Sequence, residues 1–194
     1  IIWNCLDKSM NTMTEDGLRS FQQLVTEALS EEKIKGIIIT SGKVDFSGGM
    51  DLSTLEALKR NSGSDPASKI FDYIMEAHGL LRKIELGRID DTSKSKPVAF
   101  AGSGICAGIG TEIGLACHRR FLSSSKNSKI GLPEILVGLF PGLGGTTRVP
   151  RMMGLMGASS VLLEGKLFAS NKAKSIGLVD EVVSEDELIQ KAKN

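Results

Sequence analysis

Hydrophobic residues along this chain follow two kinds of pattern, short apolar runs and stretches of helical periodicity. Residues 34–40 (IKGIIIT) and 97–101 (PVAFA) are short apolar runs, which are typical of buried strands. After Thr14, a candidate N-cap, apolar residues recur at helical spacing and predict an amphipathic helix. Its apolar positions are Leu18, Phe21, Leu24, Val25 and Leu29. Strands that alternate with helices indicate an α/β domain with largely parallel strand pairing.

The rest of the chain continues this alternation. Residues 53–96 are largely polar, with a helical section at about 69–84 between two loop-like segments, 61–66 and 87–96. The other expected strands lie at 1–3, at 121–123 and within 176–183. The other expected helices lie at 111–120 and between the glycine-rich turn 140–146 and residue 164.

Two glycine-rich turns are the first candidates for a functional site. Residues 46–52 (FSGGMDL) and 102–110 (GSGICAGIG) each follow a predicted buried strand and precede sequence that can begin a helix. Glycine lets the backbone approach a ligand closely, and amides at a helix start lack internal partners. Two such turns facing one another would aim two N–H groups at one developing oxyanion. The alternative is that the glycines only make tight connections.

Two glutamates, Glu112 and Glu134, are candidates for acid–base chemistry. Glu112 follows the second glycine turn and has apolar neighbours, among them Ile113 and Leu115. Such surroundings desolvate a carboxylate and raise its pKa toward the range a catalytic group needs. Each glutamate taken alone has a structural explanation, such as a favourable charge at a helix start. A pair of carboxylates beside a polarised carbonyl, in contrast, forms an acid–base set.

Composition and charge narrow the class of protein. The 194 residues are 41% hydrophobic and 24% charged, with a formal net charge of +1, which fits a globular domain and lacks the basic excess of nucleic-acid-binding proteins. No apolar run approaches the roughly 20 residues of a membrane-spanning helix. The cysteines Cys5, Cys106 and Cys117 show no paired spacing, which favours a reducing compartment over a disulfide scaffold.

Other motifs give weaker signals. Gly102-x-Gly104-x-x-Ala107 fits the dinucleotide-binding fingerprint. The acidic residue expected ~20 positions later, which would bind the ribose, is absent from residues 121–125 (FLSSS). A nicotinamide-dependent dehydrogenase is therefore disfavoured. No Cys/His spacing supports a zinc site, so we expect no metal, and residues 142–145 lack the Gly-Lys-Ser/Thr ending of a phosphate loop.

Five segments, taken in order, carry a family resemblance. They are 6–13 (LDKSMNTM), 37–52 (IIITSGKVDFSGGMDL), 107–116 (AGIGTEIGLA), 130–148 (IGLPEILVGLFPGLGGTTR) and 173–183 (AKSIGLVDEVV). Together they resemble the enoyl-CoA hydratase/isomerase (crotonase) family, and look most like the hydratase domain of multifunctional fatty-acid oxidation proteins. The resemblance implies an α/β fold, a crotonase-like spiral of repeated β-β-α units with peripheral helices. We expect residues 1–194 to form one such domain, incomplete at both ends.

The resemblance also implies an activity. It is that of an enoyl-CoA hydratase, a lyase that adds water to a 2-enoyl-CoA thioester in fatty-acid β-oxidation to give 3-hydroxyacyl-CoA. Glu112 and Glu134 match the family's two hydratase glutamates, with Glu112 activating the water and Glu134 protonating the α-carbon. Backbone N–H groups of Met50 and Ile109 would form the oxyanion hole. Ile109 stands where the family usually has glycine, and Gly108 is the alternative donor. The implied substrate-binding residues are Gly49, Asp51, Leu52, Gly108, Pro141 and Gly142.

Partners and location follow from the same resemblance. No cofactor is expected, because coenzyme A is part of the acyl-CoA substrate. We expect a homotrimer or larger assembly, no nucleic acid and no membrane span, with a dehydrogenase domain in the full-length chain and a thiolase partner. The expected compartment is the cytoplasm of a bacterium or the mitochondrial matrix of a eukaryote. The alternatives are an isomerase or other crotonase-type acyl-CoA enzyme, and a noncatalytic acyl-CoA-binding module.

Overall fold

The computed structural model describes residues 1–60 and 65–194. The predicted loop at 61–66 therefore lies outside the described residues except for its last two positions. There Asp65 caps helix α3 (Pro66–Leu86), because its carboxylate accepts a hydrogen bond from the Ser68 amide at 3.1 Å. The predicted helical section at 69–84 is confirmed and extended by α3.

Five parallel strands form the main sheet, in the order β1-β2-β3-β5-β8. They are β1 (Ile2–Trp3), β2 (Ile37–Ser41), β3 (Val98–Gly102), β5 (Arg119–Ser123) and β8 (Glu181–Val183). Successive side chains of a strand point to opposite faces. Ile37 and Ile39 accordingly enter the main hydrophobic core, whereas Ile38 packs with a smaller cluster on the other face. The strands predicted from the apolar runs are confirmed by β2 and β3.

Three short strands form a second sheet. β4 (Ile105–Ala107) and β6 (Lys129–Gly131) are parallel, and β7 (Leu167–Ala169) pairs antiparallel with β6. The chain passes from the main sheet to the second sheet twice in the same way. It runs from β3 through β4 into α4 (Ile109–Ala116), and from β5 through β6 into the short helix η1 (Glu134–Val137). This repetition is the β-β-α arrangement that the family resemblance implies.

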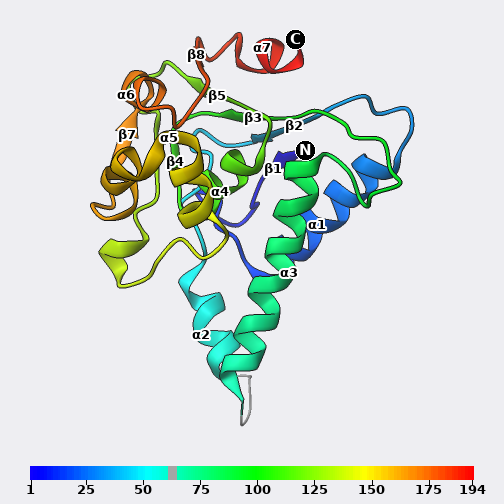
Figure 1. The fold of residues 1–194 in the computed structure, drawn as a ribbon, viewed down its shortest axis with the longest axis vertical. Helices are drawn as coiled ribbons and strands as arrows, with labels where there is room; N and C mark the ends of the chain where they lie inside the picture. The colour runs from blue at the N-terminus through cyan, green and yellow to red at the C-terminus, as the bar shows by residue number, and fades with distance from the viewer. Residues whose placement is uncertain (61–64) are drawn as a thin grey trace.

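Helices cover both faces of the main sheet (Figure 1). On one face lies α7 (Leu188–Lys193), where Leu188 packs with Ala101 and Phe121. The other face carries α1 (Glu15–Ser30), α3 and α4, while α2 (Leu52–Arg60) and α3 extend together away from the sheet. The remaining helices are α5 (Gly145–Leu162) and α6 (Ser170–Ser175). None of the helices described combines the length and the apolarity that a membrane crossing requires.

Helix α1 agrees with its prediction except at one position. Thr14 is the N-cap, since its hydroxyl accepts a hydrogen bond from the Gly17 amide at 3.0 Å. Four of the five apolar positions are buried, but Leu24 is 47% exposed and lies outside the core.

The predicted helix at 111–120 is wrong at both ends. Helix α4 begins at Ile109, directly after the glycine turn, and ends at Ala116. The chain then becomes extended because Arg119 and Arg120 pair with Ala99 and Phe100 of β3. Pairing with a distant strand is invisible to local periodicity. Helix α2 and strand β4, which lies inside the second glycine turn, were likewise not predicted.

Hydrogen bonds of the Asn11 side chain connect the first glycine turn to the main sheet. Its fully buried side chain accepts a hydrogen bond from the Cys5 amide at 2.8 Å. Its amide nitrogen reaches the carbonyls of Trp3 at 2.9 Å and Phe46 at 3.1 Å, and the Ser41 hydroxyl at 3.0 Å. One side chain thus joins the ends of β1 and β2 to the start of the turn.

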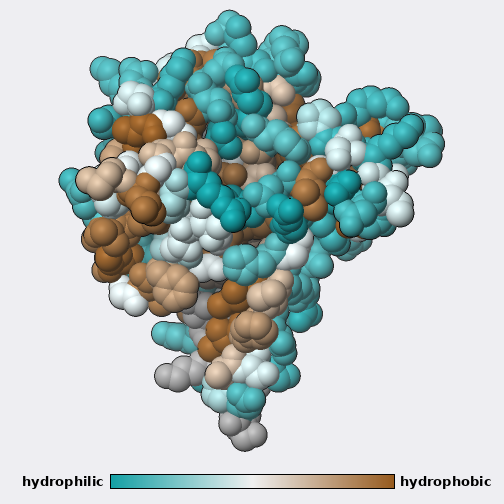
Figure 2. Space-filling model, in the orientation of Figure 1, coloured by the Kyte–Doolittle hydropathy of each residue, from teal (hydrophilic) through white to brown (hydrophobic). Residues whose placement is uncertain are grey.

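An apolar patch lies on the surface over η1 and α5 (Figure 2). Its members are exposed although hydrophobic: Ile135, Leu136, Val137, Leu139, Phe140, Leu155, Met156 and Leu163. Contiguous exposed apolar surface of this kind marks sites of association in soluble proteins.

Candidate active site

The two glycine turns meet, as the sequence hypothesis required. The Ser47 amide donates to the Ile105 carbonyl at 2.9 Å, and the Ala107 amide donates to the Ser47 carbonyl at 2.9 Å. Gly108, at φ +57°, lies so close to Gly49 that an added Cβ would be 3.3 Å from the Gly49 Cα. Glycine at both positions, with φ +103° at Gly49, permits this approach.

Two backbone amides at this junction are available to a ligand. Among the residues described, no hydrogen bond uses the N–H of Met50 or of Ile109, the first residue of α4. The Gly108 amide, the alternative donor, already donates to the Gly131 carbonyl at 3.1 Å. The arrangement therefore favours Met50 and Ile109 as the two oxyanion donors.

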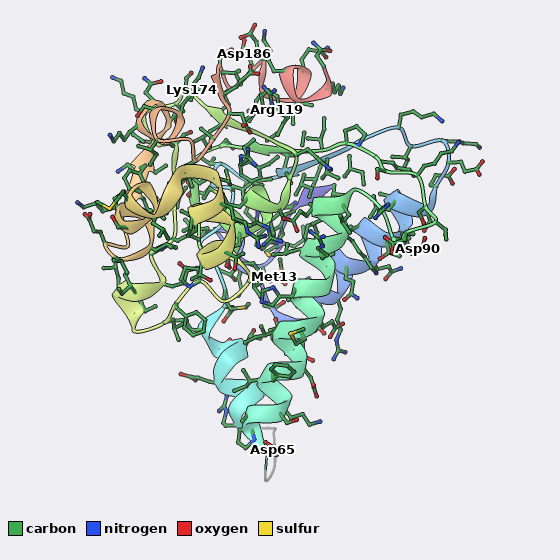
Figure 3. The ribbon with its side chains drawn as sticks, viewed as in Figure 1. Met13, Asp65, Asp90, Arg119, Lys174 and Asp186 are labelled. Carbon is green, nitrogen blue, oxygen red and sulfur yellow. The ribbon has the colours of Figure 1, made fainter. Side chains whose placement is uncertain are left out.

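Met13 fixes the backbone on either side of Met50. Its amide donates to the Gly49 carbonyl at 2.9 Å, and its carbonyl accepts from the Asp51 amide at 2.9 Å. The Met13 side chain is only 1% exposed and lies near the centre of the molecule (Figure 3). The amide of Met50 is thereby held between two fixed neighbours, as a preorganised donor requires.

Glu112 lies one turn into α4 and is 2% exposed. Its Oε1 accepts hydrogen bonds from the Leu143 amide at 2.8 Å and the Gly145 amide at 2.9 Å. Burial raises the pKa of Glu112 to about 7 and the nearby charge of Glu134 adds to this effect, while the two amides and Arg148 oppose it. Glu112 can therefore exchange a proton near neutral pH.

Glu134 is the first residue of η1 and faces the junction of the glycine turns. A Cβ on Gly108 would lie 3.3 Å from Glu134 Oε1, which places this carboxyl beside the oxyanion amides. Its Oε2 is buried and has no hydrogen-bond partner within the described parts of the chain. Burial raises the pKa of Glu134 above its usual range. A buried oxygen without a hydrogen-bond partner destabilises the fold unless a ligand or a water donates a hydrogen bond to it.

The raised pKa of Glu112 predicts how stability depends on pH. The unfolded chain ionises this carboxyl near 4.5, whereas the folded protein holds the proton until about 7. The folded state therefore binds more protons in this window, so the contribution of Glu112 to stability falls as pH rises through it. Glu112→Gln keeps an acceptor for both amides and cannot ionise. Its free energy of unfolding relative to the wild type should rise by on the order of 3 kcal/mol between these pH values.

Urea denaturation at several pH values measures this difference. Parallel stability curves for the wild type and Glu112→Gln would show that the carboxyl is not stabilised in its protonated form.

The other predicted substrate-binding residues surround the same junction. Asp51 pairs with Lys8 and accepts hydrogen bonds from the amide and the hydroxyl of Ser53 at 3.0 Å and 2.6 Å, and these contacts hold the pKa of Asp51 well below its usual range. Leu52 begins α2 and is 53% exposed. Pro141 packs against Gly145 beside Glu112, and Gly142 follows it in the turn that supplies the Leu143 amide.

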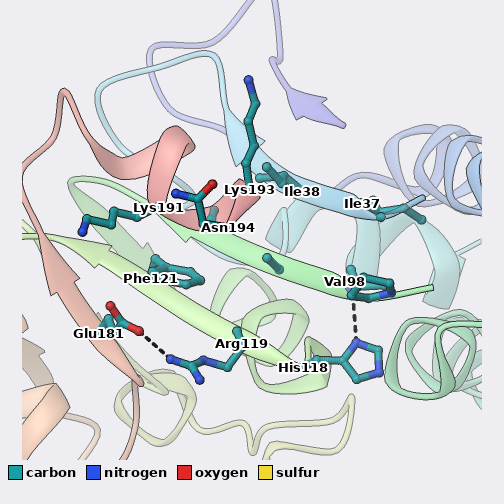
Figure 4. Close-up of a pocket in the computed structure, with 14 residues that line it drawn as sticks. Ile37, Ile38, Val98, His118, Arg119, Phe121, Glu181, Lys191, Lys193 and Asn194 are labelled. Carbon is teal, nitrogen blue, oxygen red and sulfur yellow. Dashed lines mark hydrogen bonds and ion pairs between the residues drawn. The ribbon is translucent and has the colours of Figure 1, made fainter. Parts of the chain in front are cut away.

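A separate cavity of about 610 Å³ lies against β2, β3, β5 and α7 (Figure 4). Three of its polar lining groups are partnered: Arg119 pairs with Glu181, and His118 Nδ1 accepts from the Val98 amide at 3.0 Å. Neither Glu112 nor Glu134 lines this cavity. This cavity therefore lacks the acid–base pair and the free amides of the glycine junction.

Two of the three cysteines lie in the core. Cys106 and Cys117 are buried, and burial raises the pKa of both thiols, so neither is an activated nucleophile. Among the residues described, no group of three or more His, Cys, Asp or Glu side chains could hold a metal ion.

Several residues that build the site were not identified from the sequence. The amides of Leu143 and Gly145 bind Glu112, and Arg148 lies behind them. Thr111 joins α4 to β6, donating to the Gly131 carbonyl at 2.8 Å. The only signal for the amides was the Gly144–Gly145 pair ahead of a helix, where unpartnered N–H groups are expected.

Comparisons with known proteins identify the family of this chain. The sequence model of the enoyl-CoA hydratase/isomerase family matches residues 6–194. The chain is 36% identical over 186 residues to the fatty acid oxidation complex subunit alpha of Shewanella loihica. It is 33% identical over 190 residues to the glyoxysomal fatty acid beta-oxidation multifunctional protein MFP-a of Cucumis sativus. These alignments cover 95% and 97% of this chain but 24% of each relative, so the chain spans about a quarter of their length.

Solved structures match the fold. An enoyl-CoA hydratase from Bacillus anthracis superposes with a TM-score of 0.78 at 27% identity, covering 96% of this chain and 67% of that one. An enoyl-CoA hydratase from Thermoplasma volcanium gives a TM-score of 0.79 at 26% identity, covering 96% and 70%. The chain belongs to the enoyl-CoA hydratase/isomerase family. The predicted crotonase-like fold and the resemblance to multifunctional fatty-acid oxidation proteins are confirmed.

Proposed function

We propose that this site hydrates a 2-enoyl-CoA thioester to the 3-hydroxyacyl-CoA, as a step of fatty-acid β-oxidation. The observation that carries the proposal is the arrangement of one buried and one partly buried carboxyl beside two free backbone amides. Glu112 has two amide donors, whereas Glu134 Oε2 has no partner among the described residues. Donors favour the ionised form of a carboxyl, and burial without donors favours the protonated form. Glu112 is therefore assigned as the base and Glu134 as the acid.

The proposed reaction uses each of these groups once. Glu112 accepts a proton from water as the water oxygen forms a bond to the β-carbon of the substrate. The electrons of the C=C bond move toward the thioester, whose oxygen is stabilised by the Met50 and Ile109 amides. Glu134 then delivers its proton to the α-carbon. One water is added in total, and proton exchange between the carboxyls and solvent restores the starting state.

The test is hydration of crotonyl-CoA, followed as loss of the ultraviolet absorbance of the conjugated thioester. Turnover by the purified chain supports the proposal. Conversion of a 3-enoyl-CoA to the conjugated thioester without hydration would instead assign an isomerase. Tight thioester binding without either reaction would assign a noncatalytic binding module.

The proposal extends to cofactors, partners and compartment. The reaction needs no cofactor, since both proton transfers use glutamates and coenzyme A belongs to the substrate. The two relatives named above are, by name, a fatty acid oxidation complex subunit and a β-oxidation multifunctional protein. By analogy, we propose a dehydrogenase domain in the full-length protein and a thiolase partner. The proposed compartment is the bacterial cytoplasm or the mitochondrial matrix, with the glyoxysome of the cucumber relative's name as a further alternative.

We also propose that the apolar patch over η1 and α5 binds further copies of this chain in a trimer. Leu136→Glu places a charge in the patch, at a residue that is 69% exposed, and should lower the mass of the assembly measured by light scattering. Leu6→Glu is the matched control, because Leu6 is 84% exposed and lies outside the patch. A monomeric wild type, or equal effects of both variants, would contradict the trimer.

A further inference from the structure

Arg148 lies behind the base, in the first turns of α5. Its side chain is only 11% exposed. Nη1 donates to the Leu143 carbonyl at 3.1 Å, and Nη2 donates to Glu85 Oε2 of α3 at 3.4 Å. Arg148 thus connects helix α3 to the turn between η1 and α5.

The turn that Arg148 holds is the one that binds the base. Leu143 contributes its carbonyl to Arg148 and its amide to Glu112 Oε1. Gly144, at φ +100°, lies between the two residues whose amides bind Glu112, and an added Cβ would be 2.3 Å from Arg148 Nη1. Glycine therefore leaves the space that the guanidinium occupies. The guanidinium, the turn and the carboxylate form one continuous set of contacts.

The charges around this set come from several elements. The Glu134 carboxyl of η1 raises the pKa of Glu112 when it is ionised, and the Arg148 cation lowers it. Glu85 also binds Arg82 of the same helix at 2.7 Å, so it keeps a partner when Arg148 is replaced. A cavity of about 240 Å³ behind Arg148 adds further charged and titratable groups, which are Arg120, Arg151 and His118.

We propose that Arg148 is a positioning residue for the base, which holds the Leu143–Gly145 turn on Glu112 and supplies a positive charge that favours the ionised form of Glu112. Two separate contributions are involved. The hydrogen bond to the Leu143 carbonyl orients the amides, and the buried cation favours the negative charge on Glu112. The described hydrogen bonds of Arg148 go to Leu143 and Glu85, so it acts on Glu112 through the turn and through its charge.

The inference rests on the proposed function only in giving Glu112 the role of base. Its test therefore measures the protonation of the Glu112 carboxyl and not the activity. Infrared spectroscopy follows the carboxyl absorption of protonated Glu112 against pH, with the band assigned by its loss in Glu112→Gln. Arg148→Met should move the titration midpoint upward by about one pH unit, the lower end of the effect of a nearby opposite charge. Arg148→Lys keeps the charge, so its titration midpoint should move by less than half as much.

Arg151→Met is the matched control, because Arg151 lines the same cavity but is exposed and makes no described hydrogen bond to the turn. An unchanged midpoint in Arg148→Met, or equal shifts in Arg148→Met and Arg151→Met, would overturn the inference. If Arg148→Met does not fold, Arg148→Gln, which retains hydrogen-bond donors without the charge, gives the same comparison. The wild-type chain could fail to hydrate crotonyl-CoA while the Arg148 variants show the expected shifts of the Glu112 midpoint. That result would refute the proposed function and leave the effect of Arg148 on Glu112 intact.

Discussion

Replacing Glu112 or Glu134 with glutamine is expected to lower kcat for crotonyl-CoA hydration by roughly 10²–10⁴-fold, the usual contribution of general acid–base catalysis. Glutamine at 112 can still accept hydrogen bonds from the Leu143 and Gly145 amides, but it cannot take a proton from water. Glutamine at 134 occupies the same space and cannot deliver a proton to the α-carbon. Both variants should retain the fold and bind the thioester.

Controls separate loss of chemistry from loss of structure. Glu56→Gln makes the same chemical change at an exposed position of α2 and should leave kcat unchanged. Binding of a thioester to each variant, measured by calorimetry, should stay close to that of the wild type. A Glu112→Gln or Glu134→Gln variant with wild-type turnover would remove that residue from the mechanism.

The second large effect is expected from Ile109→Pro, which deletes one oxyanion donor. Proline lacks the backbone N–H but is well tolerated at the first position of a helix, and Ile109 is the first residue of α4. The preceding residue is Gly108, which has no Cβ to clash with the ring. Loss of one such donor typically costs ~2.7–4 kcal/mol, so hydration should slow by roughly 10²–10³-fold.

Ile109→Ala is the matched control for this variant. It removes most of a side chain that is only 3% exposed but keeps the N–H. The activity ratio of the two variants therefore isolates the amide from the packing. Equal activities of Ile109→Pro and Ile109→Ala would show that this N–H does not stabilise the transition state.

The sequence by itself determined the features that depend on near neighbours. Thr14 caps α1 because its hydroxyl reaches the Gly17 amide three residues away. The apolar runs became β2 and β3, since short runs buried on both faces suit a parallel sheet. The two glycine turns and both glutamates were identified because residue types and order carry the family resemblance. These predictions needed no knowledge of what lies across the fold.

Only the tertiary structure decided which groups meet. Gly108 was the alternative oxyanion donor until the Gly131 carbonyl, more than twenty residues away, was found to occupy its amide. The pairing of Arg119 with Ala99 limits how far α4 extends. The hydrogen bonds to the Glu112 carboxyl come from amides that lie more than thirty residues further along the chain. Arg148 and Asn11 have ordinary local patterns and acquire their roles through contacts with other elements. Burial and hydrogen bonding between distant segments depend on how the chain packs, and sequence spacing alone does not encode them.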